Sequence, residues 1–263
     1  MRPVSSLPPE EAARLRGLLF DLDDTVLTHG VLTRGAFDAL WTLHDAGLLL
    51  VAVTGRPFGW ADVIARQWPV AGCVAENGAL YVVRDGAGLR VCDACDDKER
   101  LDRRQRLERL ADRVRNVVPE ACPTDDRYAR RSDYTWDIGE RARLPDDSVR
   151  AIIREIESAG ARWSLSSIHL HATFDGEDKA SGAVRFCARE LGEDEGSATY
   201  RFAFVGDSSN DAPCFSAFRT TFGVDNVRSA VARLSLPPRY VASRPMGEGF
   251  AEIAEELLGK RRA

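Results

Sequence analysis

The first indication of chemistry in this chain is a group of carboxylates that follows an apolar run near its beginning. Residues 18–20 are Leu, Leu and Phe, and Asp21, Asp23 and Asp24 come directly after them. An apolar run of this kind predicts a buried strand, and the ligands of open α/β sheets bind where such strands end. The alternative is an acidic turn that caps the next helix.

The spacing of Asp21 and Asp23 predicts that their side chains lie together. Side chains two positions apart on a strand point to the same side of the sheet. Two like charges in that arrangement repel each other unless a cation lies between them, and oxygen ligands suit Mg²⁺. The pair therefore predicts a magnesium site.

Polar side chains also follow two later apolar runs and open one later helix. Singly, each such group is more often a turn residue, a helix cap or a solvated surface residue. Together they are expected to converge, because the carboxyl ends of parallel strands share one edge of the sheet. The residues in question are Thr54 and Gly55, then Lys179, then Asp207, Asn210 and Asp211.

Such an edge could transfer a phosphoryl group. The hydroxyl of Thr54, the ammonium of Lys179 and the amide of Asn210 can bind phosphate oxygens. Asp21 could act as the nucleophile and form an aspartyl-phosphate. Asp23 could protonate the leaving oxygen and later deprotonate the attacking water. Uncatalysed hydrolysis of phosphate monoesters is among the slowest reactions known, so a metal ion and a covalent step are expected.

The predicted elements that would carry these residues indicate an α/β fold with a doubly wound, mostly parallel sheet. Residues 1–82 alternate strands and helices and form the first segment of a core domain. The pattern changes over 83–172, which predicts an inserted α+β cap domain. The alternation returns over 173–263, the second core segment.

Within the insert, the sequence predicts two helices and two long strands after an initial hairpin. The hairpin is expected around Asp85-Gly86. The helices are expected at 98–118 and 145–159, and the strands at 128–138 and 162–174.

Polar residues of the insert could recognise the rest of a substrate. Arg130 and Arg131 could bind a carboxylate or a second phosphate; the alternative is a solvated strand end. Ser167, His169 and His171 alternate on one strand and could hydrogen-bond sugar hydroxyls. The alternative for these three is an exposed sheet face.

Composition restricts the class of protein. The formal net charge of the 263 residues is −5, with both signs interspersed, so nucleic acid is not an expected partner. No apolar run approaches membrane-spanning length, and the N-terminal stretch lacks a signal-peptide core. We expect a cytoplasmic monomer or homodimer. Its six cysteines are expected to be reduced, with Cys92 and Cys95 as plain thiols in preference to zinc ligands.

The motifs resemble those of the haloacid dehalogenase (HAD) superfamily of phosphatases. An insert between the second and third motifs is similar to the subclass IIB cap of Cof-type, sucrose-phosphate, trehalose-phosphate and mannosyl-3-phosphoglycerate phosphatases and of phosphomannomutase. The segments Glu76-Asn77-Gly78 and Asp225-Asn226 also resemble family segments. The main matching motifs are Asp21-Leu22-Asp23-Asp24-Thr25, Thr54-Gly55-Arg56-Pro57, Lys179 and Gly206-Asp207-Ser208-Ser209-Asn210-Asp211.

The resemblance implies a role for each matching residue. Asp21 would be the nucleophile and Asp23 the general acid/base, which also binds the metal through its backbone carbonyl. Dehalogenases and P-type ATPases lack a carboxylate at the position of Asp23. Phosphate would be held by Thr54, Gly55, Lys179 and Asn210. Mg²⁺ would be held by Asp21, Asp23, Asp207 and Asp211. Substrate specificity would involve Arg56, Arg130, Arg131, His169 and His171.

We therefore expect a Mg²⁺-dependent phosphatase of small phosphorylated metabolites, with sugar phosphates as substrates. One alternative is a phosphomutase of the same subclass, which would retain the phosphoryl group and need a bisphosphate activator. Another is a non-hydrolytic sensor of a phosphorylated metabolite, against which the retained Asp23 argues. A dinucleotide-binding domain lacks support, because no G-x-G-x-x-G motif follows the first strand.

Overall fold

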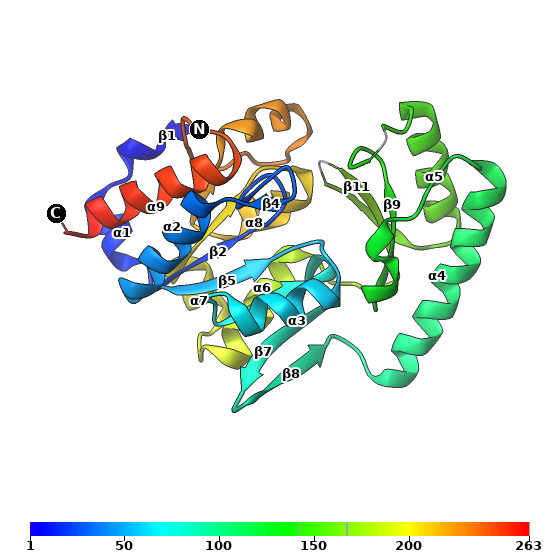
Figure 1. Ribbon diagram of the computed structural model, residues 1–263, viewed down its shortest axis with the longest axis horizontal. Coiled ribbons are helices and arrows are strands. Elements are labelled where there is room, and N and C mark those ends of the chain that lie inside the picture. The colour runs from blue at the N-terminus through cyan, green and yellow to red at the C-terminus, as the bar shows by residue number, and fades with distance from the viewer. Residues whose placement is uncertain (142, 167, 263) are drawn as a thin grey trace.

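The computed structural model describes residues 1–141, 143–166 and 168–262, which form a large α/β unit and a smaller unit beside it (Figure 1). The strands of the large sheet are β1 (Arg2–Pro3), β2 (Gly17–Phe20), β5 (Leu49–Val53), β6 (Gly72–Ala75), β7 (Leu80–Asp85), β8 (Gly88–Asp93), β12 (Phe202–Gly206), β13 (Thr220–Gly223) and β14 (Tyr240–Val241). A separate short hairpin is formed by β3 (Leu27–Thr28) and β4 (Val31–Leu32).

The large sheet is mostly parallel. Within the described residues its strand order is β1-β14-β13-β12-β2-β5-β6-β7-β8. Neighbours from β1 to β6 pair in parallel, whereas β7 and β8 pair antiparallel at one edge. The predicted doubly wound, mostly parallel sheet is therefore confirmed.

Helices cover both faces of this sheet. One face carries α1 (Pro9–Arg14), α2 (Arg34–Asp45), α3 (Phe58–Gln67) and α9 (Met246–Arg262). The other face carries α6 (Lys179–Glu190), α7 (Glu195–Arg201) and α8 (Ala212–Ala217). Short 3₁₀ helices lie at η1 (Val4–Ser6), η2 (Glu76–Gly78), η3 (Asp125–Ala129), η4 (Ser209–Asp211), η5 (Asp225–Ser229) and η6 (Val231–Arg233).

The apolar runs are continuous because the sheet is buried on both faces. Leu18 and Phe20 of β2 belong to the hydrophobic core under α2 and α9. Leu19 belongs to the core on the opposite face, where it pairs in register with Val51 and Phe204. Because both of its faces are buried, β2 lies in the middle of the sheet. Its position determines where Asp21, the next residue, is placed.

The smaller unit is an antiparallel three-stranded sheet covered by two helices. Its strands are β9 (Asp133–Asp137), β10 (Arg162–Leu165) and β11 (His169–Thr173), in the order β10-β11-β9. Its helices are α4 (Asp97–Val117) and α5 (Asp146–Ser158), which share a core of their own with these strands. We call residues 97–173 the cap.

The first boundary of the insert differs from the prediction. The sequence places it at residue 83, but β7 and β8 extend the large sheet, with Cys73 of β6 paired to Val82 and Tyr81 to Cys92. The hairpin signal shows which two strands pair with each other, but not which sheet they join. The smaller unit therefore begins after Asp93.

Two predicted strands of the cap are also shorter than expected. Residues 128–132 do not extend β9, because η3 occupies the chain up to Ala129. The strand expected at 162–174 is two antiparallel strands, β10 and β11. After β10, the hydroxyl of Ser166 accepts a hydrogen bond of 3.0 Å from the backbone N–H of His169. Ser167, which the sequence analysis grouped with the histidines, lies outside the described residues.

Two further findings concern the chain as described. Its cysteines are free thiols, among them Cys92 and Cys95 of the predicted pair. None of the helices among residues 1–141, 143–166 and 168–262 is long and apolar enough to cross a membrane.

Candidate active site

Three strand ends bring the predicted residues to one edge of the large sheet. Asp21 follows β2, Thr54 follows β5 and Asp207 follows β12, and β2 lies between the other two. Because the three strands run parallel, their carboxyl ends meet at the same edge. Asp21 and Asp207 are almost fully buried there, and Thr54 is completely buried.

Lys179 lies at the centre of a group of carboxylates. Its Nζ is 2.8 Å from Oδ1 of Asp21 and 2.6 Å from Oδ1 of Asp211. Although burial lowers the pKa of Lys179, these two carboxylates raise it above its ordinary value, so the ammonium stays charged. Asp207 completes the group, since carboxylate oxygens of Asp21, Asp207 and Asp211 lie within 4.8 Å of one another.

One ammonium does not balance three buried carboxylates. Burial and the neighbouring carboxylates raise the pKa of Asp21 to about 7, and they raise the pKa of Asp207 well above its ordinary value. Burial and mutual repulsion thus both disfavour the ionised form of these carboxyl groups when no cation is bound. Oxygen ligands with excess negative charge fit a hard divalent cation such as Mg²⁺.

The lysine is positioned by a reciprocal cap at the start of α6. The backbone N–H of Ser181 donates to Oδ1 of Asp178 (2.9 Å), and the backbone N–H of Asp178 donates to the hydroxyl of Ser181 (2.9 Å). Gly78 packs directly against this cap, because a Cβ there would lie 2.0 Å from the carbonyl oxygen of Asp178. The backbone at the start of α6, and with it the position of Lys179, is therefore fixed by these contacts.

Two further loops hold the carboxylates of this edge. Oδ2 of Asp211 accepts from the backbone N–H groups of Asp207 (2.9 Å) and Ser208 (3.1 Å), which fixes the loop after β12. Asp207 accepts from Nδ2 of Asn226 (2.9 Å) and from the hydroxyl of Thr25 (3.3 Å). The Asp225-Asn226 segment noted in the sequence thus contributes through Asn226.

The carboxylate of Asp23 is held by an arginine. Arg56 donates to it from Nε (2.9 Å) and Nη2 (2.8 Å), and the same Nη2 donates to Glu140 of the cap (2.9 Å). The guanidinium also lies over the ring of Trp60, 4.5 Å from its centroid. Arg56 was expected to contact substrate, but its side chain is buried in these interactions. Arg56 is also not among the described residues that line the cavity between the two units.

A second contact joins the cap to the large unit. The buried Glu76 accepts from the backbone N–H of Arg131 (2.9 Å), from that of Asp133 (3.2 Å) and from the hydroxyl of Ser132 (2.6 Å). One side chain of the large unit thus holds the backbone that leads into β9. Sequence reasoning marked the Glu76 segment only as a family resemblance and assigned it no contact.

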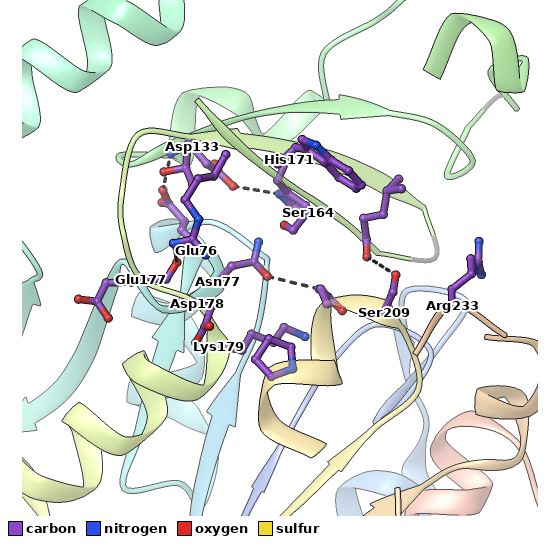
Figure 2. Close-up of a pocket in the computed structure, with 16 residues that line it drawn as sticks. Glu76, Asn77, Asp133, Ser164, His171, Glu177, Asp178, Lys179, Ser209 and Arg233 are labelled. Carbon is purple, nitrogen blue, oxygen red and sulfur yellow. Dashed lines mark hydrogen bonds and ion pairs between the residues drawn. The ribbon is translucent and has the colours of Figure 1, made fainter. Parts of the chain in front are cut away.

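A cavity of about 430 Å³ lies between the two units at this edge. Figure 2 shows Asn77 and Lys179 on the side of the large unit, with Asp133 and His171 of the cap across the cavity. Asn210 lines it too, and its Nδ2 donates to Oδ1 of Asn77 (3.3 Å). Of the predicted phosphate-binding residues, Lys179 and Asn210 therefore line the cavity. Thr54 and Gly55, like Asp21, are not among the described residues that line it.

The structure separates the two cap histidines. His171 lines the cavity, whereas Nε2 of His169 lies 2.8 Å from Oε2 of Glu140. This contact lowers the pKa of Glu140 to about 2. Of the predicted pair, only His171 therefore lines the cavity, and its buried Nε2 has no hydrogen-bond partner among the described residues.

The two predicted cap arginines do not line the cavity in the described structure. Arg130 is buried and forms ion pairs with Asp126 (3.1 Å) and Asp133 (3.1 Å). Arg131 is exposed, and its guanidinium lies over the ring of Phe58 at 3.9 Å from the centroid. Acidic side chains three and four residues away thus already pair with Arg130, and Arg131 is exposed, so neither is placed at the cavity. That they bind a substrate anion stays a prediction.

Comparisons with known proteins cover most of the chain. No family model matches it. A phosphoglycolate phosphatase from Methanothrix thermoacetophila is 38% identical over 223 residues, covering 82% of this chain and 85% of that protein. A phosphoglycolate phosphatase from Pyrobaculum aerophilum is 28% identical over 245 residues, covering 92% of this chain and 95% of that protein.

The fold also has counterparts among solved structures. A phosphatase of the haloalkanoate (HAD) enzyme superfamily from Bacteroides thetaiotaomicron matches with a TM-score of 0.63 at 18% sequence identity. The match covers 97% of this chain and 98% of that one, so it includes the cap as well as the large unit.

Proposed function

Because the chain belongs to the haloacid dehalogenase (HAD) superfamily and is a phosphoric monoester hydrolase, we propose that it uses Mg²⁺ and a covalent aspartyl-phosphate on Asp21 to hydrolyse small phosphorylated metabolites. The observation that supports this most strongly is the buried group of Asp21, Asp207 and Asp211 around the ammonium of Lys179. Structural ion pairs rarely leave three buried carboxylates with one cation, whereas a site for a metal ion and a phosphate uses that arrangement.

The carboxylates divide the work of holding the metal. Asp21 and Asp207 would bind Mg²⁺ directly, with the backbone carbonyl of Asp23, and Asp211 would orient the loop that presents Asp207. When bound, Mg²⁺ supplies positive charge that offsets the carboxylates and the phosphoryl oxygens. Burial raises the pKa of Asp21, whereas Lys179 supplies a fixed positive charge that lowers it and so favours the ionised nucleophile.

The reaction proposed for these residues has two steps. First, a carboxylate oxygen of Asp21 bonds to phosphorus, the bond from phosphorus to the ester oxygen breaks, and Asp23 gives its proton to that oxygen. Then water attacks the phosphorus, its proton passes to Asp23, and the bond to Asp21 breaks with release of phosphate. Arg56 fixes the position of the Asp23 carboxylate for both proton transfers.

Two substrate classes follow from different observations. The curated relatives are named phosphoglycolate phosphatases, which makes phosphoglycolate one candidate. Sugar phosphates, expected from the sequence, are the other, and a cavity of about 430 Å³ has room for either. Both belong in the first assay.

The test is release of inorganic phosphate, with Mg²⁺, from phosphoglycolate, phosphoglycerates, sugar phosphates and nucleoside monophosphates. Asp21→Asn serves as the inactive control, and its folding is verified by circular dichroism. Chelation with EDTA should stop phosphate release, and added Mg²⁺ should restore it. Turnover that persists in chelator would refute the metal assignment. Retention of the phosphoryl group on protein or product, without release, would instead support the mutase or the sensor.

A further inference from the structure

The imidazole of His171 is held in one orientation by the cap. Its Nδ1 is 2.9 Å from Oδ2 of Asp133 and 3.0 Å from the hydroxyl of Thr135. Asp133 is itself buried and paired with the guanidinium of Arg130. Although burial raises the pKa of Asp133, Arg130 and His171 lower it to about 2, so this carboxylate is ionised at neutral pH.

An ionised Asp133 determines which ring nitrogen of His171 carries the proton. A carboxylate can only accept a hydrogen bond, so Nδ1 of His171 donates to it. Burial lowers the pKa of His171 to about 4, and the ring is therefore neutral at pH 7. In a neutral imidazole with the proton on Nδ1, Nε2 carries a lone pair and can only accept.

Nε2 of His171 has no hydrogen-bond partner among the described residues, although the side chain is 97% buried. His171 lines the cavity. Its Nε2 lies beside the loop that carries Thr54 and Gly55, because a Cβ on Gly55 would be only 3.1 Å from it. The same hypothetical Cβ would lie 3.2 Å from the amide of Asn77. A residue with a side chain at position 55 would thus occupy the space into which the histidine projects.

A buried acceptor without a partner loses free energy unless a ligand or a water supplies a donor. Resting on the function proposed above, we infer that Nε2 of His171 accepts a hydrogen bond from a substrate hydroxyl close to the phosphate ester. Because Nε2 lies beside Gly55 of the proposed phosphate-binding loop, we expect that hydroxyl on the carbon next to the one that bears the phosphate. The preferred substrates are then monophosphates of vicinal diols, such as phosphoglycerates, glycerol phosphate and sugar phosphates.

This subsite distinguishes the two candidate substrate classes. Phosphoglycolate has no hydroxyl next to its phosphate ester, and its carboxylate would place lone pairs against the lone pair of Nε2. Behind the ring, 2.9 Å from Nδ1, Asp133 is paired with Arg130, so this pair offers no net positive charge to an anionic group. The cap therefore favours a neutral donor over an anionic group at this point.

The test uses two pairs of esters that differ in a single hydroxyl. The first pair is 3-phosphoglycerate and the phosphate ester of 3-hydroxypropionate. The second is glycerol 3-phosphate and the monophosphate of propane-1,3-diol. In at least one pair, kcat/KM of the wild-type enzyme should be about tenfold or more higher for the hydroxylated ester, as expected for one buried hydrogen bond.

Two substitutions at position 171 separate the two ring nitrogens. His171→Asn places an amide where Nδ1 lies and nothing at Nε2, so the ratio within a pair should fall to about one. His171→Gln reaches the Nε2 position and should restore part of the ratio. His169→Asn is the matched control, because Nε2 of His169 is already bound to Glu140 and the ratio should stay that of the wild type.

Binding to Asp21→Asn, measured by calorimetry with the same two pairs, tests the subsite without turnover. Tighter binding of the hydroxylated esters, lost in Asp21→Asn/His171→Asn, would support it. Equal binding and equal turnover within both pairs, with phosphate still released, would overturn the proposed subsite. The proposed phosphatase function would not be affected by that result. Absence of phosphate release from every ester would overturn the proposed function, while the binding ratio still decides the subsite.

Discussion

The guanidinium of Arg56 lies between the carboxylates of Asp23 and Glu140, 2.8 Å from one and 2.9 Å from the other. Asp23 belongs to the large unit and Glu140 to the cap, so one arginine side chain connects the proposed proton donor to the element that covers it. Glu140 in turn contacts His169. The position of the cap and the orientation of Asp23 are therefore linked.

Glu140→Gln should lower kcat/KM about tenfold, because it removes the charge that draws Arg56 toward the cap. Global stability should change little, since the Glu140 side chain is partly exposed (28%). Steady-state kinetics and thermal unfolding measure the two effects. Glu120→Gln is the matched control, since Glu120 is an exposed cap glutamate that accepts a hydrogen bond from the hydroxyl of Ser148. Equal kinetics for the two variants would contradict the link.

Asp21→Asn should abolish phosphate release and leave the fold intact. The substitution keeps the shape of the side chain but removes both the nucleophile and one buried charge. Lys179 retains its contact with Asp211 at 2.6 Å, so the ammonium does not lose every partner. Thermal unfolding in the absence of Mg²⁺ should therefore show a melting temperature equal to or above that of the wild type. Phosphate release near the wild-type rate would be incompatible with the covalent step.

The stability of the metal-free protein should fall as pH rises from about 4 to 7. The pKa of Asp21 is raised by burial from the ordinary 3.8 to about 7 in the folded state. Between these values the folded state binds more protons than the unfolded state, so the free energy of unfolding decreases with pH. The pKa of Asp207 is shifted in the same direction.

Mg²⁺ should reverse this trend, because it competes with protons for the same carboxylates. The rise in melting temperature on adding Mg²⁺ should be larger at pH 8 than at pH 5.5. Differential scanning fluorimetry at the two pH values measures it, with Asp21→Asn expected to show a weaker pH dependence. A Mg²⁺ effect of the same size at both pH values would argue against a shared site.

Arg130→Met should destabilise the protein by about 3–5 kcal/mol, because it leaves the buried Asp133 without its ion-pair partner. Arg131→Met, at the adjacent position, should cost less than about 1 kcal/mol, since that arginine is exposed and stacks on Phe58. Urea unfolding of both variants provides the comparison. A larger loss of stability in Arg131→Met than in Arg130→Met would contradict the structural role given to Arg130. A raised KM for an anionic substrate in Arg131→Met alone would show that Arg131 binds substrate.

The sequence predicts the central sheet and the edge that carries the candidate site well, because the signals for both are local. Each strand that leads to the site is an apolar run, and each polar residue follows it directly, as Asp21 follows residues 18–20. Parallel pairing of the strands then brings their carboxyl ends together, independently of the conformations of the connecting loops. Sequence position alone thus locates Asp21, Thr54 and Asp207.

Contacts that span long stretches of chain could not be predicted in this way. Arg56 and Glu140 are 84 positions apart, and nothing near either residue shows that the other is its partner. Glu76 accepts from backbone groups 55 to 57 positions away, which any sequence could supply. The same holds for Arg130, whose acidic neighbours are visible in the sequence but whose burial depends on tertiary packing.

The reciprocal cap of Asp178 and Ser181 has a mechanical consequence. The chain leaves the cap at Thr173 and reaches Lys179 only six residues later. Asp178 is tied to Ser181 and packed against Gly78, whereas Asp175 is buried and paired with Arg100 and Arg103 of the cap. A swing of the cap would therefore be taken up by residues 176 and 177. The lysine would then stay still while the lid above it moves, so that access to the nucleophile could change without disturbing its charge.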